Sequence, residues 1–311
     1  MAIFGRGFDT TGSTKLPIIY IIYTKENLII MKICISAEST IDLQKEQLEE
    51  FNIHTIPFTV LLGADPKFDG VITPTEIFDY VDKTGVLPKT SAINEMQYEE
   101  YFTGLLKEYD AVIHFALSSE ISSACHNAVN VAKGLKNVFV VDSRSLSTGI
   151  ALEAIYASTL AKQGLSPEEI VKKVEARIPY NQTSFVLATV DYLYKGGRCS
   201  GLAKLGAMLF RIRPQIIMAD GKMSPGKKYM GKQLGCVESY AKDTLDQFNN
   251  PDKSLVFITH SMATPEMVEA CRKECEARGF KRIIETRAGA TISSHCGPKC
   301  IGILYFNDGD K

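Results

Sequence analysis

The sequence predicts an α/β protein built from two domains. Short apolar runs with the character of strands alternate along the chain with amphipathic segments of helical spacing, and this order indicates a mostly parallel sheet covered by helices. The 311 residues suffice for two domains, and the 45% hydrophobic and 23% charged content is that of an ordinary globular protein. We expect an N-terminal α/β domain at 31–180 and a smaller C-terminal α/β domain at 181–311.

The first thirty residues differ from the rest of the chain. Their apolar run at 16–23 is followed by Lys25 and Glu26, and it is shorter than the roughly 20 residues that a membrane-spanning helix needs. No small-residue cleavage site follows, so a secretory signal is not expected. Met31 opens a clear strand, and we therefore expect Met31 to be the natural start and 1–30 to be an extension outside the fold.

In the N-terminal domain the apolar runs predict strands at 32–36, 53–62, 111–116 and 138–142. Helical spacing predicts helices at 42–51, 94–109, 120–133 and 146–162. Two further helices are expected to begin at Thr73 and Ser166. Each of these residues is followed by proline and, at the third position, by glutamate, which is the pattern of a capping box.

The C-terminal domain has the same kinds of segment in a different order. We expect strands at 183–189, 213–219, 255–260, 282–286 and 301–306. Helices are expected at 232–248 and 265–278, and a glycine-rich loop at 196–201.

The charge and the cysteine spacing of the sequence argue against nucleic-acid, membrane and metal binding. The formal net charge is −1, so we expect neither nucleic-acid binding nor stable membrane insertion, and Lys227 with Lys228 is interpreted as a solvated basic face. The cysteine pairs 271/275 and 296/300 do not have the CxxC spacing of a zinc site, so no metal is expected. Eight scattered cysteines are typical of free thiols in a reducing cytoplasm.

Three loops are candidates for chemistry, because each follows a strand or precedes a helix, where α/β proteins place ligands. In the first, Thr90 and Ser91 could simply cap the next helix, or their hydroxyls could accept an anion. In the second, four serines within residues 118–123 are more than a helix cap requires, and anion site and cap are equally good explanations of Ser122. In the third, His295 lies beside a Gly-Pro turn, as a structural residue or a ligand.

Two enzymatic interpretations of these loops are weaker. The serine-rich run 142–149 lacks the Gly-Lys-Ser/Thr end of a phosphate-binding loop. A hydrolytic triad of Ser122, His295 and Asp142 is conceivable, but no G-x-S-x-G sequence surrounds the serine.

Taken in order, these segments resemble the DegV family of fatty-acid-binding proteins from about residue 31 to residue 306. The resemblance rests on eight segments with family-like spacing: Glu38 to Asp42, Asp69-Gly70 before Ile72 to Glu76, Lys89 to Ser91, Leu117 to Ser122, Val141 to Ser143, Tyr192 to Arg198, Arg213-Pro214 and His295 to Pro298.

The resemblance implies two α/β domains that hold one long-chain, palmitate-like fatty acid in a tunnel between them, with no cofactor and no catalysis by the protein itself. In bacteria, such proteins present the acyl chain to a fatty acid kinase, which forms an acyl phosphate. Thr90 or Ser91 together with Ser122 would bind the carboxylate, and His295 would lie close to it. The resemblance also leaves a supporting role for Ser119, Ser123, Arg198, Lys228 and Lys232.

The chain departs from the family pattern at three places. Glu38 replaces an aspartate after the first strand, and Ser122-Ser123-Ala124 replaces Ser-Gly-Thr. Met230 stands where members that serve the kinase carry an arginine, so the phosphotransfer role is less well supported than binding; Lys228 or Lys232 could substitute.

Two other function classes stay open at this point. One is a kinase-like or hydrolase-like enzyme acting on a small phosphorylated or carboxylated substrate in the same cleft, since the fold family includes dihydroxyacetone kinase. It predicts a polar pocket, whereas a lipid carrier predicts a long apolar tunnel. The other, a regulatory or interaction module, predicts neither.

Overall fold

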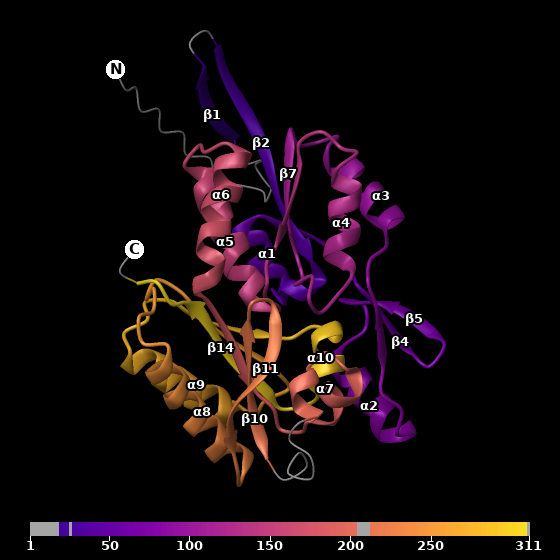
Figure 1. Cartoon of the computed structure of the whole chain (residues 1–311), viewed down its shortest axis with the longest axis vertical. Helices are drawn as coiled ribbons and strands as arrows, with labels where there is room; N and C mark the ends of the chain where they lie inside the picture. The colour runs from indigo at the N-terminus through magenta and orange to yellow at the C-terminus, as the bar shows by residue number, and fades with distance from the viewer. Residues whose placement is uncertain (1–18, 25–26, 204–211, 310–311) are drawn as a thin grey trace, which may run out of the picture.

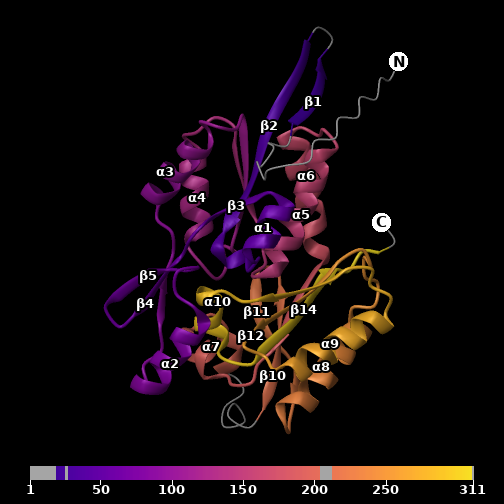
Figure 2. The same cartoon turned by 180° about the vertical axis from the view of Figure 1, so that it is seen from behind.

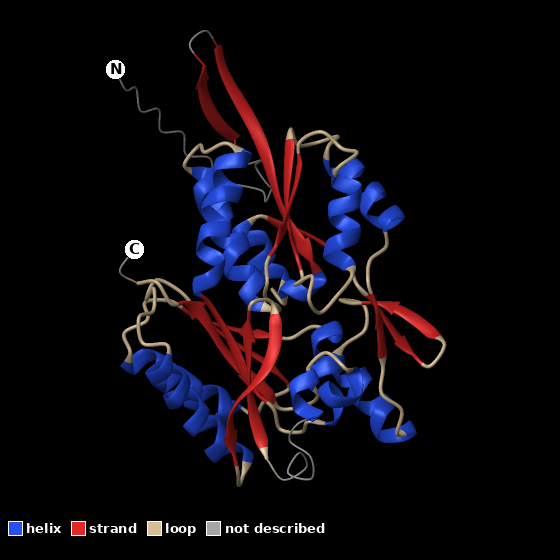
Figure 3. Cartoon of the chain, in the orientation of Figure 1, coloured by secondary structure: helices blue, strands red, loops and turns tan. Residues whose placement is uncertain are grey.

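The computed structural model describes residues 19–24, 27–203 and 212–309 of the chain. Their strands form a five-stranded sheet in the first half, a six-stranded sheet in the second half, and a small three-stranded sheet beside them. Helices cover the two larger sheets (Figures 1 and 3). The α/β fold class predicted from the alternation of strands and helices is therefore confirmed.

The first sheet is mainly parallel. β2 (Asn27–Glu38) pairs in parallel with β3 (Ile53–Ile56) and with β7 (Ala111–Ala116), and β7 pairs in parallel with β8 (Val138–Asp142). All six residues of β7 are buried, as expected for a central strand covered on both faces.

Part of the segment that we expected outside the fold takes strand structure. β1 (Ile19–Thr24) pairs with the start of β2 as an antiparallel hairpin, and Figure 1 shows this hairpin standing out from the rest of the molecule. Residues 19–24 and 27–30 thus extend the first sheet. Residues 1–18 lie outside the described part of the chain, and for them the expectation stays a prediction.

Helices pack on both faces of the first sheet (Figures 1 and 2). They are α1 (Lys45–Phe51), α3 (Glu95–Leu105), α4 (Ala124–Ala132), α5 (Thr148–Lys162) and α6 (Pro167–Arg177). The capping box predicted at Ser166 is present, since its hydroxyl accepts the Glu169 N–H while Glu169 accepts the Ser166 N–H. The box predicted at Thr73 likewise begins α2 (Pro74–Thr84).

The single strand predicted at 53–62 is instead two strands in different sheets. Pro57, which has no N–H for a strand ladder, stands between β3 and β4 (Thr59–Leu62). β4 pairs with β5 (Asp65–Phe68) and with β6 (Lys89–Ser91) in the small sheet. The small sheet and α2 extend from the first domain and contact α10 (Ala290–Cys296) of the second half.

The second sheet is mixed. Its strand order is β11 (Lys222–Tyr229), β10 (Arg213–Ala219), β9 (Asn181–Val186), β14 (Cys300–Phe306), β12 (Val256–Ser261) and β13 (Ile283–Arg287). β12 and β13 run parallel, and the other neighbours are antiparallel. α8 (Gln233–Gln247) and α9 (Pro265–Ala277) cover one face (Figure 2).

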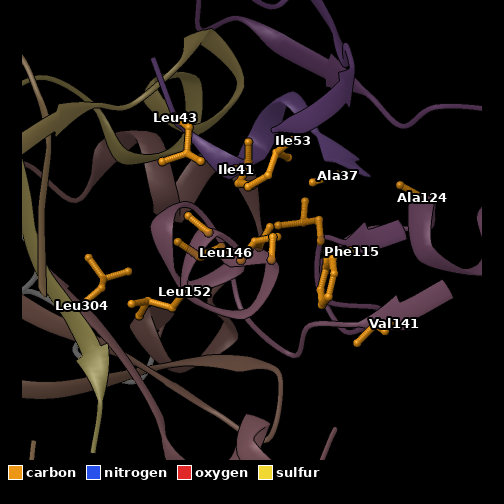
Figure 4. Close-up of a cluster of buried hydrophobic side chains, with 14 of the residues drawn as sticks. Ala37, Ile41, Leu43, Ile53, Phe115, Ala124, Val141, Leu146, Leu152 and Leu304 are labelled. Atoms are coloured by element: carbon orange, nitrogen blue, oxygen red, sulfur yellow. The ribbon is translucent and has the colours of Figure 1, made fainter. Parts of the chain in front are cut away.

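Helix α5 lies between the two larger sheets. It packs against β2 and β7 of the first sheet and against β9 and β14 of the second. The helix has buried residues on every side, as expected from its largely apolar sequence. Figure 4 shows the resulting core, in which Leu152 of α5 and Leu304 of β14 belong to the same cluster as Phe115 and Val141 of the first sheet.

The remaining elements are short. They are α7 (Asp191–Gly196), α10, and the 3₁₀ turns Ser39–Ile41 and Ile178–Tyr180. The first sheet ends with β8 and the second begins at Asn181, so we keep the domain division at 180/181 as a proposal. Within the described ranges no helix has the length and apolar character needed to cross a membrane.

Candidate functional site

A cavity of about 390 Å³ lies where the small sheet, the loop after β7, α7 and α10 meet. Its polar lining comes from Thr90, Ser91, Ser122, Ser123, Asn127, Arg198, Thr291 and His295. Its apolar lining includes Phe58, Leu117, Ile121, Leu146, Leu193, Met223 and Ile292. The volume is that of an ordinary small-molecule site, and both halves of the chain contribute to the wall.

Thr90 and His295 meet across 205 residues of sequence. The Thr90 hydroxyl lies 2.8 Å from the His295 Nε2 atom. Thr90 is placed there by β6, where it pairs with Val60 of β4, and Asn94 rather than Thr90 or Ser91 caps the following helix. The capping interpretation of Thr90 and Ser91 is therefore wrong. Ser91 lines the same cavity but is largely exposed at its mouth.

The four serines after β7 divide into two pairs. Ser122 and Ser123 line the cavity, and the Ser122 hydroxyl accepts the Ala124 N–H at 3.2 Å. Ser119 instead donates to Asp142 at 2.5 Å, and Ser118 donates to the Gly221 carbonyl at 2.7 Å. Ser119 therefore lies outside the cavity wall, and its contacts hold the loop in place.

Glu38 fixes the start of the same loop through hydrogen bonds. Its carboxylate is fully buried and accepts hydrogen bonds from the Leu117 N–H at 2.5 Å and from the Tyr98 hydroxyl at 2.6 Å. The sequence indicated that Glu38 replaces an aspartate within the family-like segment 38–42. Its contact with Leu117, 79 residues away, had no local signal.

The surroundings of His295 keep its imidazole neutral. Burial, helped by the positive charge of Arg198, lowers the pKa of His295 to about 4. At neutral pH one ring nitrogen is therefore a donor and the other an acceptor. The Nδ1 atom is buried without a hydrogen-bond partner in the described structure.

The Gly-Gly-Arg sequence forms the wall beside this ring. A β-carbon at Gly196 would lie 2.8 Å from His295 Nδ1, so glycine lets the end of α7 approach the imidazole. Gly197 ends α7 with φ of +71°. Arg198 then lines the cavity and donates to the Gly196 carbonyl at 2.7 Å.

Two buried aspartates position α10, which carries His295. Asp69 accepts the N–H groups of Ala290 at 2.8 Å and of Thr291 at 3.1 Å, and Asp42 accepts the Gly289 N–H at 2.7 Å. The segment before His295 is helical because carboxylates from the first half of the chain satisfy its free N–H groups.

The basic residues after the Asp220-Gly221 turn lie elsewhere. Lys228 and Lys232 are exposed and do not line the cavity. Met230, which occupies the position of the family's arginine, is 71% exposed. The structure thus brings together Thr90, Ser91, Ser122, Ser123, Arg198 and His295, and it does not bring Ser119, Lys228 or Lys232 to them.

The hydrolytic triad is not assembled. Asp142 accepts from Ser119 and from the Arg144 N–H, while His295 pairs with Thr90. No aspartate or glutamate stands among the described residues that line the cavity. The wall thus offers hydroxyls, a neutral imidazole and one guanidinium to an anion, beside an apolar surface.

Comparison with known proteins agrees with this architecture. A Thermus thermophilus structure described as fatty acid binding of a DegV family protein matches with a TM-score of 0.82 at 25% identity, over 88% of this chain and 99% of that one. A stearic acid-binding protein from Eubacterium ventriosum matches with a TM-score of 0.77 at 26% identity, over 89% and 98%. A fatty acid-binding protein of Thermotoga maritima is 27% identical over 282 residues, which are 88% of this chain and 96% of that protein.

The family model described as "Uncharacterised protein, DegV family" matches residues 32–308, which is nearly all of the part that carries both sheets and the cavity. The chain therefore belongs to the DegV family.

Proposed function

We propose that this protein binds one long-chain fatty acid, without catalysis, in the cavity between its two halves. The observation that carries the proposal is that the wall of one cavity contains both a group of hydrogen-bonding side chains and a set of large apolar side chains. The hydroxyls of Thr90 and Ser122 and the neutral ring of His295 line this cavity together, and leucine, isoleucine, methionine and phenylalanine side chains supply much of its apolar surface.

The polar part suits a carboxylate. Such a group cannot enter a buried site unpaired, and hydroxyls together with a neutral imidazole pair it without the desolvation of a second full charge. Arg198, which is exposed, contributes positive potential from the edge. We assign the carboxylate to Thr90, Ser91, Ser122 and His295.

The apolar part supplies the affinity. A sixteen-carbon acid has fourteen methylenes, whose burial contributes on the order of 11 kcal/mol of gross transfer free energy at about 0.8 kcal/mol each. Loss of translational and chain freedom offsets several kcal/mol of this. The remainder corresponds to tight but reversible binding, which is what a carrier requires.

The names of similar proteins support the same ligand. The Thermus, Eubacterium and Thermotoga proteins are described as binding fatty acids, stearic acid in the Eubacterium case. The matched region spans 99%, 98% and 96% of the length of these three proteins, respectively.

We further propose that the carboxylate is presented to a fatty acid kinase in the cytoplasm. The support is that Ser91 and Arg198 are exposed, so the polar part of the cavity lies next to solvent. All eight cysteines are free thiols, in keeping with that compartment. Met230 stands where members that serve the kinase carry an arginine, so Lys228 or Lys232 would have to take the place of that arginine.

Lipid extraction of the purified protein followed by mass spectrometry tests the ligand. We expect about one acyl chain per protein molecule. After delipidation, calorimetric titration with palmitate should restore a single site. Absence of co-purified lipid together with absence of palmitate binding would contradict the proposal. Kinase presentation is tested separately, by adding a DegV-partner kinase and ATP to the loaded protein and measuring acyl phosphate.

A further inference from the structure

A second, much smaller cavity of about 20 Å³ lies next to the main one. Leu146, Ile292 and Cys296 line both cavities, so these three side chains form the junction. Ile292 lies three residues before His295 and four before Cys296, so all three are on the side of α10 that faces the main cavity, and Ile292 and Cys296 also reach the small one. The rest of its wall comes mostly from the second sheet and includes Phe185, Cys300 and Leu304.

The polar side chains in the wall of this small cavity are already engaged. Each has a partner: Thr259 pairs with Thr148, Ser261 with Ser293, Ser147 with Asp42, and His260 with the Ala263 N–H. A space of this size holds about one water molecule, but a water needs two to four polar partners. The small cavity is therefore suited to an apolar group of that size.

The two thiols of this region do not change that character. Cys296 and Cys300 are both buried, and the hydrogen bond that the Cys300 thiol donates to Cys296, together with burial, raises the pKa of Cys300 well above its ordinary value. The Cys300 thiol therefore stays protonated, and a buried cysteine side chain packs as a small, polarisable apolar group.

We infer that the small cavity holds the terminal methyl group of the bound acyl chain, so that Cys300 and Leu304 determine the longest chain that the protein accepts. The inference rests on the proposed function. With its carboxylate at Thr90 and His295, the chain passes the junction at Leu146 and Cys296 and ends against β14. With the carboxylate fixed at the polar residues and the methyl group against β14, the space between them would limit the length of the acyl chain.

Chain-length dependence follows from this geometry. Each added methylene that finds room raises the affinity by about fourfold, the equivalent of about 0.8 kcal/mol. A methylene beyond the length at which the methyl group reaches β14 has no room and lowers the affinity. The affinity of saturated acids should therefore rise with length to an optimum and then fall.

The experiment titrates delipidated protein with saturated acids of ten to twenty carbons and compares three variants with the wild type. Cys300→Leu fills the small cavity and should shorten the optimum by about two carbons, because leucine has two more side-chain atoms than cysteine. Leu304→Ala enlarges the cavity and should lengthen the optimum. Cys300→Ala, the matched control, should not shorten it.

Decanoate, the shortest acid of the series, is the internal reference, because we expect its chain to end before the small cavity; its Kd should change less than twofold in every variant. An unchanged optimum in both Cys300→Leu and Leu304→Ala, or an equal loss at all lengths, would overturn the inference. If Cys300→Leu does not fold, Leu304→Ala decides alone. A wild type that binds no acid of any length would contradict the proposed function instead.

Discussion

At the scale of single residues, binding depends on a few polar atoms that are otherwise surrounded by apolar side chains. Thr90 reaches His295 through the small sheet, and Ser122 reaches the same cavity from the loop after β7. None of these groups carries a full charge at neutral pH. Their effect on a carboxylate therefore depends on hydrogen-bond geometry, and single substitutions should measure it.

Removal of one hydroxyl should weaken binding of the acid selectively. A hydrogen bond to a charged group contributes about 1.5 kcal/mol or more, so Ser122→Ala or Thr90→Val should raise the Kd for palmitate by about tenfold. Calorimetric titration checks this, with hexadecanol as the control ligand because it lacks the carboxylate. Equal losses for acid and alcohol would show that these hydroxyls do not bind the head group.

The lowered pKa of His295 predicts a pH dependence of stability. In the unfolded chain the ring takes up a proton near pH 6.5, and in the folded chain near pH 4, so the unfolded state binds more protons between these values. The contribution of His295 to the free energy of unfolding is thus complete above pH 6.5 and is lost as the pH falls toward 4.

Urea unfolding of delipidated wild type and His295→Gln between pH 7 and pH 4 measures this contribution. The wild type should lose more stability than the variant over that range, because glutamine does not titrate. Parallel pH profiles of the two proteins would mean that His295 is not held neutral by its surroundings.

At the scale of elements, α10 determines where His295 lies, although α10 has little sequence signal of its own. Its small and hydroxyl-bearing residues show no apolar period, and its N–H groups are satisfied by Asp69 and Asp42 from far along the chain. Such long-range capping is invisible to local pattern. The capping boxes at Thr73 and Ser166 were predictable because both partners lie within four residues.

Substitution of Asp69 should therefore affect both stability and binding. Asp69→Ala leaves two N–H groups of α10 without an acceptor, which should lower the free energy of unfolding by about 1–3 kcal/mol and weaken palmitate binding through displacement of His295. Asp69→Asn keeps one acceptor and should lose less. Asp79→Ala, at an exposed position on α2, is the control. Normal stability and binding in Asp69→Ala would refute this role.

The close approach of α7 to α10 gives a second test at this scale. Gly196→Ala places a methyl group 2.8 Å from His295 Nδ1, so the ring or the loop must move, and palmitate binding should weaken severalfold. Gly235→Ala is the matched control, because a β-carbon at Gly235 in α8 has no neighbour within 4 Å. The two variants should differ in Kd, and equal Kd values would contradict the proposed contact.

At the scale of the whole molecule, the two halves of the chain pack against the same helix, α5. This helix packs on both large sheets, and Arg177 at the end of α6 contacts Asp252 and Asp308 of the second half. We expect the delipidated protein to unfold in a single transition, with equal calorimetric and van't Hoff enthalpies. Two separate transitions would show that the halves are independent.

Fatty acid should stabilise this single unit. A ligand that binds only the folded state adds about 2.7 kcal/mol at a free concentration one hundred times its Kd, so palmitate should raise the unfolding temperature in a concentration-dependent way. Scanning calorimetry with and without palmitate measures the shift, and hexadecane serves as the control for non-specific apolar binding. No shift at saturating palmitate would contradict a ligand site between the halves.

Most strands and helices of the two large sheets were predictable from periodicity, because each buries one stripe or a continuous apolar run. The edge strands β1 and β11 were not predicted. The division of 53–62 at Pro57 and the three-stranded sheet were not, since their pairing joins β4 to β6 across α2. Thr90, Ser122 and His295 were predicted by residue type and family-like order. Their actual placement, on a strand, a loop and a helix, depends on contacts such as Glu38 with Leu117 that only the folded chain brings together.

The crystal structure of the protein with palmitate tests the central claim most directly. The account predicts continuous density for one acyl chain, with carboxylate oxygens within hydrogen-bonding distance of Ser122 and of Thr90 or His295. Its terminal methyl group should lie against Cys300 and Leu304. A chain bound in the reverse direction, a chain bound elsewhere, or an empty cavity at saturating palmitate would contradict it.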